Sequence, residues 1–243
     1  KQVVVAGSYR RGQETVGDLD ILVTADKGSA VMDKFVEYDE VQEVAAKGTT
    51  RATVFLRCGL QVDLRVVPAE SFGAALQYFT GSKEHNVHLR GLAKSRGLKI
   101  NEYGVFSIKG EKRINGDTED SVFKAVGLPF IPPELRQGHG EIEAAQAGHL
   151  PRLITLDDLQ GDLHVHSNES DGNASIEEMA LAAKQRGLKY IAISDHSKSL
   201  TVAHGLNEAR LAKQIEIIDQ LNERIDGITI LKSSEVDILE NGR

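Results

Sequence analysis

Two short motifs near the start of the chain constrain its fold more than any other feature. The first, GSYRRG at residues 7–12, follows an apolar run that predicts a short strand over residues 3–6. The second, GDLD at residues 17–20, begins an alternating stretch that predicts another strand. In such a strand the carboxylates of Asp18 and Asp20 share one face, and the apolar residues between them share the other. The chain therefore joins a glycine turn to a strand with paired carboxylates.

These motifs offer the groups that a magnesium–triphosphate complex needs. Gly7 lets a phosphate approach closely, Ser8 offers a hydroxyl and a backbone N–H, and Arg10 and Arg11 add positive charge. Like-charged carboxylates on one strand face repel each other and favour a cation between them. The alternative is a solvated strand end with surface arginines, which a lone Asp-x-Asp would favour. The glycine-serine turn directly upstream favours a site for metal and nucleotide instead.

A third carboxylate, Asp63, lies on the second strand of a hairpin predicted over residues 51–67. Asp63 and Arg65 share one face of that strand. By itself Asp63 is as readily the salt-bridge partner of an arginine as a metal ligand. With two carboxylates expected on a neighbouring strand, we interpret it as a ligand.

Two helices follow the hairpin. The first is predicted over residues 70–79, and Ser82 is expected to cap the second. Asn86 and Arg90 lie four residues apart and therefore share one face of that second helix. Without further context such a pair is typical of a solvated face.

The helical pattern breaks after residue 129. Residues 130–160 contain several glycines and prolines and predict an irregular linker with a short helix over residues 141–147. A β-α-β-α-β series is predicted beyond the linker.

The strand ends of this series carry metal-binding residue types. His164 and His166 alternate at the end of the first strand, so both imidazoles point the same way, and Asp171 follows five residues later. The next two strands lead to His196 and to Glu235. Active sites of α/β barrels gather at the carboxyl ends of strands, so this pattern predicts a metal site.

The composition excludes several classes of protein. No apolar run approaches the roughly 20 residues that a membrane-spanning helix needs, and no signal peptide is visible. The single cysteine, Cys58, excludes an internal disulfide, is expected to be a small buried thiol, and favours a cytoplasmic location. The net charge of −7 is unusual for a DNA-binding protein, but carboxylates that bind cations make the loaded protein less negative. Because the chain starts at Lys1, directly at a strand, we expect a piece of a longer protein.

Residues 3–130 resemble the catalytic core of the family X DNA polymerases, the group that includes DNA polymerase beta, and its bacterial members in particular. Residues 161–243 resemble the start of a PHP (polymerase and histidinol phosphatase) domain, which follows the core in bacterial members. The implied fold is an α+β polymerase palm and thumb of the nucleotidyltransferase type over residues 1–129, a linker over 130–160, and a partial α/β PHP barrel over 161–243. The matching core motifs are GSYRRG (7–12), GDLD (17–20), VDLR (62–65), YFTGS (78–82) and INEYG (100–104).

The resemblance implies roles for individual residues in the core. Asp18, Asp20 and Asp63 would be catalytic and would hold two Mg²⁺ or Mn²⁺ ions. Arg90 and Arg65 would bind DNA, Arg90 on the template side, and Arg65 would pair with a catalytic carboxylate in the unloaded state. Nucleotide-binding roles fall on Ser8, Arg11 and Gly17 for the triphosphate, with Gly7 beside them, on Tyr78, Phe79 and Gly81 for the sugar, and on Asn86 for the minor-groove edge. Lys83 departs from the pattern, because DNA polymerase beta has there an acid that contacts the incoming base.

In the PHP segment the resemblance implies a site for Zn²⁺ or Mn²⁺. The family builds a distorted seven-stranded barrel with three metals, and it needs further ligands downstream. Three strands do not close a barrel, so we expect a truncated PHP domain without nuclease activity of its own. The metal ligands carried over to this sequence are His164, His166, Asp171, His196 and Glu235.

The expected function is template-directed addition of deoxynucleotides to a primer 3′-hydroxyl in gap filling and repair, joined to a 3′–5′ exonuclease or phosphoesterase module. The expected partners are gapped or primed DNA and a deoxynucleoside triphosphate, with no membrane, and the expected state is a monomer. One alternative is a template-independent nucleotidyltransferase, against which residues 62–65 and 78–82 argue. A catalytically dead DNA-binding scaffold is a second, and the retained aspartates argue against it. A PHP phosphoesterase whose front half only recruits DNA is a third.

Overall fold

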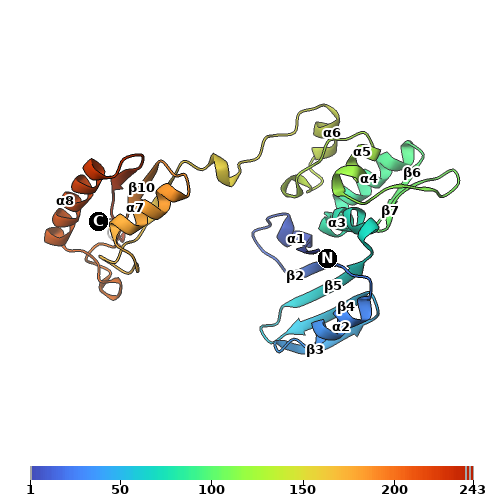
Figure 1. Ribbon diagram of the computed structural model, residues 1–243, viewed down its shortest axis with the longest axis horizontal. Coiled ribbons are helices and arrows are strands. Elements are labelled where there is room, and N and C mark those ends of the chain that lie inside the picture. Colours follow the sequence, from blue (N-terminus) through green and yellow to red (C-terminus); the bar gives the residue numbers. More distant parts are fainter. Residues whose placement is uncertain (1, 239, 241, 243) are drawn as a thin grey trace. The chain divides into compact units, whose positions relative to one another are not determined.

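A computed structural model describes residues 2–238, 240 and 242 of the chain (Figure 1). The chain divides into two compact units, Lys1–Pro151 and Arg152–Arg243. Within the described part, no helix is both long enough and apolar enough to cross a membrane.

A five-stranded sheet forms the palm of the first unit. Strands β2 (Asp18–Thr24) and β5 (Gln61–Val67) are neighbours inside the sheet and run parallel, whereas the other neighbouring pairs are antiparallel. Helix α2 (Gly28–Val36) covers one face and buries Met32 against Val23, Leu64 and Val66. The strands lie in the order β1 (Val3–Val5), β2 (Asp18–Thr24), β5 (Gln61–Val67), β4 (Arg51–Leu56) and β3 (Val41–Lys47).

The opposite face of this sheet is only partly covered. Helix α3 (Phe72–Thr80) packs over the carboxyl ends of the two central strands, where Leu22 and Val67 join its core. The amino-terminal half of β2 carries Asp18 and Asp20 on this same face, because side chains alternate along a strand. The packing therefore buries one end of the face and leaves the carboxylate end accessible.

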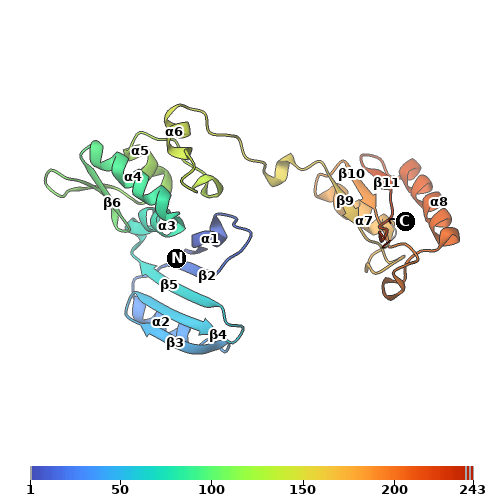
Figure 2. The same cartoon turned by 180° about the vertical axis from the view of Figure 1, so that it is seen from behind.

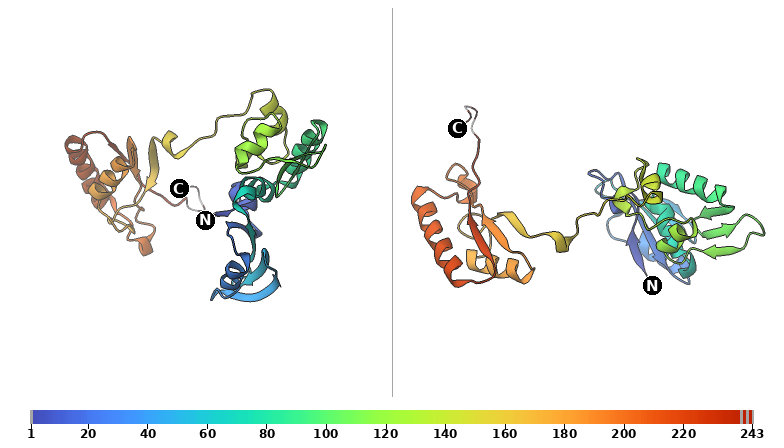
Figure 3. Two further views of the ribbon diagram at one scale, coloured as in Figure 1. Left: turned by 45° about the vertical axis from the view of Figure 1, so that its right-hand side comes forward. Right: turned by 90° about the horizontal axis from the view of Figure 1, so that it is seen from above.

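A second, three-stranded sheet, helix α3 and three further α-helices form the thumb (teal to olive in Figure 3). The prediction that Ser82 caps the second helix is confirmed, since its hydroxyl accepts the backbone N–H of His85. The elements are η1 (Ala69–Ser71), α4 (Lys83–Ser95), β6 (Leu98–Asn101), β7 (Gly104–Ser107), β8 (Arg113–Asn115), α5 (Glu119–Ala125), η2 (Pro133–Leu135) and α6 (Glu141–Gln146).

Part of the predicted linker packs into the first unit. Ile131, Ile142 and Ala145 belong to the same apolar core as α4 and α5. Glu141, at the start of α6, lies 2.7 Å from Nδ1 of the buried His85. The glycine-rich composition around these few apolar residues hides their role, because three buried positions in a short helix make a weak periodic signal.

A three-stranded parallel sheet forms the second unit, in the order β11-β10-β9. The predicted β-α-β-α-β series is confirmed, and both of its helices pack on the sheet in one apolar core that includes Ile191, Ile193 and Ile218 (Figure 2). Its elements are η3 (Leu156–Asp158), β9 (Gly161–Val165), α7 (Ile176–Gln185), β10 (Tyr190–Ile193), η4 (Thr201–Ala203), α8 (Glu208–Arg224) and β11 (Thr229–Lys232).

Two local expectations are wrong. The glycine-serine turn opens a one-turn helix, α1 (Gly7–Arg10), because Gly7 adopts a left-handed φ of 63° from which the chain winds directly into a helix. Cys58 is exposed rather than buried, because it sits at the tip of the β4–β5 turn, where nothing packs over it.

One buried ion-pair group ties α1 and α5 to the segment between η2 and α6. Arg136 is 0% exposed, and its Nη1 donates to Oε1 of Glu119 at 2.6 Å. Arg10 of α1 donates to both oxygens of the same carboxylate, at 2.9 and 2.7 Å. Glu119 therefore compensates a guanidinium that has no access to water.

We expect Glu119→Ala to lower the free energy of unfolding by about 3–5 kcal/mol, because it leaves the buried charge of Arg136 uncompensated. Urea denaturation measures the change. The matched control is Asp120→Ala, which removes a carboxylate that is 46% exposed and pairs with Lys124, and it should cost no more than about 0.5 kcal/mol. Equal losses in the two variants would contradict the assignment.

Protonation of Glu119 at acid pH should remove the stabilisation that its ion pairs with Arg10 and Arg136 provide. Burial raises the pKa of Glu119, but hydrogen bonds and charges from Arg10 and Arg136 outweigh it and hold this pKa below the ordinary value of 4.5. A carboxyl with a lowered folded-state pKa stabilises the fold above its unfolded pKa and loses that contribution as the pH falls through the folded value. The stability difference between the unsubstituted chain and Glu119→Ala should therefore be constant near neutral pH and shrink below pH 4.5. A difference independent of pH would contradict this.

Candidate active site and metal centre

The three aspartates converge on one face of the palm sheet. Strands β2 and β5 are parallel and in register, so Asp20 stands directly beside Asp63 and Asp18 beside Gln61. Because alternate residues of a strand share a face, all three carboxylates lie on the same side. Residues distant along the chain therefore form a single acidic group.

The charges of this group act on one another. The pKa of Asp20 is raised to about 6, first by burial and then by the charges of Asp18 and Asp63, against the opposing charges of Arg65 and Arg11. Burial and mutual repulsion make it unfavourable for all of these carboxylates to be ionised together. A divalent cation bound among them would stabilise the fully ionised state. The donor chemistry fits Mg²⁺ or Mn²⁺.

Asp63 has neutral donors of its own. Oγ1 of Thr53 donates to it at 2.5 Å and Nε2 of Gln61 at 2.7 Å, while Arg51 lies at 3.4 Å. Burial raises the pKa of Asp63, but these contacts together hold it below the ordinary value. Sequence reasoning missed Thr53, although the hairpin register places it directly opposite Asp63.

The expected pairing of Arg65 with a catalytic carboxylate is wrong for this structure. The guanidinium of Arg65 lies over the ring of Phe79, 4.6 Å from its centroid. Among the described residues no ion pair joins it to the three aspartates, and Arg51 is the cation that pairs with Asp63. The reason is the neighbouring aromatic side chain, which offers Arg65 a stacking partner at the edge of the acidic group.

A cavity of about 380 Å³ opens beside Asp18 and Asp20. It collects the residues that the sequence assigned to nucleotide binding, with the exception of the exposed Gly17. Lys83 and Arg90 also line it, so three cations surround the cavity together with Arg11. The predicted nucleotide-binding residues in its wall are Gly7, Ser8, Arg11, Tyr78, Phe79, Gly81 and Asn86.

Gly7 has a close neighbour that the sequence did not indicate. The sequence suggested that its missing side chain makes room for a phosphate. A Cβ at this position would lie 2.5 Å from Oδ2 of Asp20, at a left-handed φ of 63°. Gly7 therefore makes room for a carboxylate of the acidic group.

Asn86 is not on a solvated face. Its Oδ1 accepts a hydrogen bond from Nε2 of Gln77 at 2.7 Å, and its Nδ2 donates to the carbonyl of Tyr78 at 2.7 Å. Gln77 was missed by sequence reasoning, although a single amide in the otherwise apolar α3 is an unusual residue. These contacts fix the orientation of the Asn86 amide at the cavity wall.

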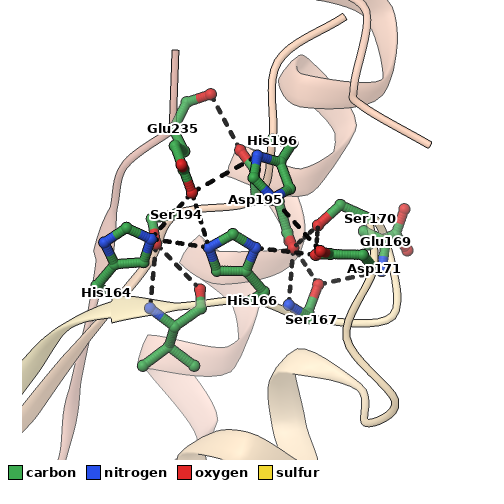
Figure 4. Close-up of polar contacts among 12 residues, drawn as sticks. His164, His166, Ser167, Glu169, Ser170, Asp171, Ser194, Asp195, His196 and Glu235 are labelled. Atoms are coloured by element: carbon green, nitrogen blue, oxygen red, sulfur yellow. Dashed lines mark hydrogen bonds and ion pairs between the residues drawn. The ribbon is translucent and has the colours of Figure 1, made fainter. Parts of the chain in front are cut away.

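The second unit brings its five predicted ligands together (Figure 4). His164, His166 and Glu235 form one group, and His166, Asp171 and His196 form another, each with ligand atoms within 4.8 Å of one another. The two groups share His166, whose Nε2 lies 3.0 Å from Glu235 and whose Nδ1 lies 2.9 Å from Asp171. The side chains come from three different strand ends.

The geometry of this group fits a transition-metal centre. The rings of His164 and His166 stack at 5.0 Å with only 4° between their planes, so both imidazoles point the same way, as the alternation predicted. Their Nε2 atoms lie 2.9 Å apart, and each lies near the same oxygen of Glu235. Imidazole nitrogens and carboxylate oxygens are the donors that Zn²⁺ and Mn²⁺ accept.

Three family models match the chain. The DNA polymerase beta palm covers residues 1–69, the DNA polymerase beta thumb residues 75–137, and the PHP domain residues 162–241.

The chain is similar to known polymerases. It is 42% identical over 239 residues to "DNA polymerase/3'-5' exonuclease PolX" of Bacillus subtilis, covering 98% of this chain and 42% of that protein. It is 32% identical over 161 residues to DNA polymerase lambda of Rattus norvegicus, covering 55% of this chain and 28% of that protein. The chain therefore spans less than half the length of these relatives. A solved ternary P/T complex of Leishmania infantum polymerase beta matches with a TM-score of 0.50 and 25% identity, over 56% of this chain and 67% of that one.

The order of the three matched domains and the similarity to PolX along nearly the whole sequence agree with the geometry of both sites. The chain belongs to the bacterial family X DNA polymerases, with a polymerase beta palm and thumb followed by PHP-domain sequence.

Proposed function

We propose that the first unit catalyses template-directed transfer of deoxynucleotides to a primer 3′-hydroxyl, in DNA gap filling and repair. The observation that carries this proposal is the convergence of Asp18, Asp20 and Asp63 beside a cation-lined cavity. Two relatives are described as DNA polymerases, and the solved neighbour is a ternary P/T complex, which supports primed DNA and a deoxynucleoside triphosphate as partners.

The proposed roles are those that the family resemblance implies, and the positions of the side chains support them. Asp18 and Asp20 would hold both ions of a Mg²⁺ or Mn²⁺ pair, and Asp63 would hold the ion at the primer hydroxyl. Such a pair, when bound, stabilises charge on the attacking and leaving oxygens of phosphoryl transfer. Ser8 and Arg11, which line the same cavity, bind the triphosphate.

The other walls serve the sugar and the base. Tyr78 and Phe79 meet edge to face at 5.1 Å and offer an apolar surface to the sugar. The amide of Asn86, held by Gln77, is oriented for the minor-groove edge. Arg90, exposed at the cavity rim, contacts the template strand.

For the second unit we propose that it is the metal-binding part of a phosphoesterase module of the 3′–5′ exonuclease type, and we expect this unit alone to lack nuclease activity. The five converging ligands hold Zn²⁺ or Mn²⁺, and the printed description of PolX includes a 3′–5′ exonuclease. We further propose that the protein acts as a cytoplasmic monomer, in keeping with its single, exposed Cys58 and its proposed DNA substrate.

Templated extension of gapped DNA tests the polymerase assignment. With Mg²⁺ and labelled deoxynucleotides, Asp63→Ala should lower the rate of addition by about 10²–10³-fold, because it removes a group that stabilises charge in the transition state. The control is Asp33→Ala, an exposed aspartate on α2 paired with Lys47, which should leave the rate unchanged. Untemplated addition would support the template-independent alternative, and extension unaffected by Asp63→Ala would contradict the proposal.

Gly7→Ala should lower the rate of nucleotide addition, whereas its thermal stability should match that of a control variant with similar backbone strain. The new Cβ would displace the Asp20 carboxylate, which lies 2.5 Å away, and the left-handed φ costs about 1–2 kcal/mol in addition. Gly59→Ala supplies the matched control, because its φ of 86° imposes the same backbone strain with no neighbour within 4 Å. Comparable thermal unfolding with an activity loss only in Gly7→Ala is the expected result, and equal activities would refute it.

A further inference from the structure

A buried carboxylate lies directly behind the metal ligands of the second unit. Asp195 follows β10, immediately precedes His196, and is only 1% exposed. Its oxygens accept hydrogen bonds from the backbone N–H of Ser167 at 2.7 Å, from Oγ of Ser167 at 2.5 Å, and from Oγ of Ser170 (Figure 4). Nε2 of Gln214 donates the fourth, at 2.6 Å.

These four donors fill the acceptor capacity of the carboxylate. An ionised carboxylate offers about four lone-pair sites, and it cannot donate. Asp195 lies in neither of the two ligand groups that the described residues form. The Asp195 carboxylate therefore holds protein donors in place, and it has no free lone pair with which to bind a metal.

Three of the four donors belong to the loop that carries a metal ligand. Ser167 lies four residues before Asp171 and Ser170 directly precedes it. Oγ of Ser170 also lies 3.3 Å from Oδ1 of Asp171. That carboxylate in turn lies 2.9 Å from His166 and 3.4 Å from Nε2 of His196. Fixing this loop thus fixes the distance between Asp171 and both imidazoles.

Helix α8 supports the same arrangement without supplying a ligand. Gln214, 1% exposed, holds Asp195 from the helix side. Arg210 donates to the carbonyl of His204 at 2.7 Å and to the carbonyl of Glu169, which lies in the loop before Asp171. The helix therefore clamps the loop that follows β9 and the loop that follows β10.

We propose that Asp195 is a positioning residue of the metal centre, acting through the loop 167–170 to hold Asp171 opposite His166 and His196. The inference rests on the metal-dependent function proposed for this unit. Groups that orient metal ligands through hydrogen bonds typically change metal affinity by about 10–100-fold when they are substituted.

Binding of Mn²⁺ to the 243-residue chain, followed by the electron paramagnetic resonance signal of free Mn²⁺, tests the proposal. All samples carry Asp18→Asn and Asp20→Asn, so that the palm carboxylates do not contribute. Asp195→Asn keeps the shape of the side chain but turns one acceptor oxygen into a donor that faces other donors. We expect the affinity for Mn²⁺ to fall by about 10–100-fold.

A double-mutant cycle separates positioning from a general structural role. If Asp195 acts through Asp171, Asp195→Asn should change the affinity by less than about threefold in an Asp171→Ala background. The same loss in both backgrounds would show a purely structural effect and overturn the proposal. Ser170→Ala removes one donor and leaves Asp195 in place, so it should weaken binding in the same direction, by a smaller factor, even if Asp195→Asn does not fold.

The remaining outcomes are also decisive. Asp219→Asn, an exposed aspartate on α8 paired with Lys232, is the control and should leave the affinity unchanged. Unchanged affinity in both Asp195→Asn and Ser170→Ala would overturn this inference alone. No Mn²⁺ binding by the chain before substitution of Asp195 would overturn the proposed metal centre, and the inference with it.

Discussion

Repulsion among carboxylates on two in-register parallel strands is the constraint on which the first unit depends. Asp20 stands beside Asp63, and burial together with the neighbouring charges raises the pKa of Asp20 to about 6. The opposite faces of the same strands bury Leu64 and Val23 against α2, so apolar packing holds the strands together in spite of this repulsion. The fold thereby keeps a local arrangement that is unfavourable without a cation, which is typical of functional sites.

The sequence predicts the parts of this site that follow from local periodicity. Alternation of polar and apolar residues places Asp18 with Asp20, and Asp63 with Arg65, on common strand faces, and the structure has those faces. The parallel pairing of β2 with β5 is a long-range feature that alternation does not contain, and the expectation of neighbouring strands left their direction and register open. The partner of Arg65 was mispredicted for the same reason, since Phe79 reaches it from a helix outside the sheet.

Residues of the same type in similar sequence contexts can differ in burial, and therefore in role. Asp171 and Asp195 both lie near histidines at strand ends. Asp171 is exposed and its carboxylate groups with His166 and His196, whereas Asp195 is buried. The donors that enclose Asp195 include Gln214, 19 residues away on α8, and no local pattern joins the two. The predicted linker shows the same limit, because Ile131 and Ile142 enter the thumb core through contacts that their glycine-rich surroundings conceal.

The two units support a buried carboxylate in the same way. Asp63 receives a hydroxyl and an amide from Thr53 and Gln61, while Asp195 receives hydroxyl, amide and backbone donors from its loop and α8. Neutral donors stabilise an anion without cancelling its charge. For Asp63, beside Asp20, the retained charge adds to the attraction for a cation. For Asp195 every acceptor site is filled, so the same chemistry serves only to fix the ligands in front of it.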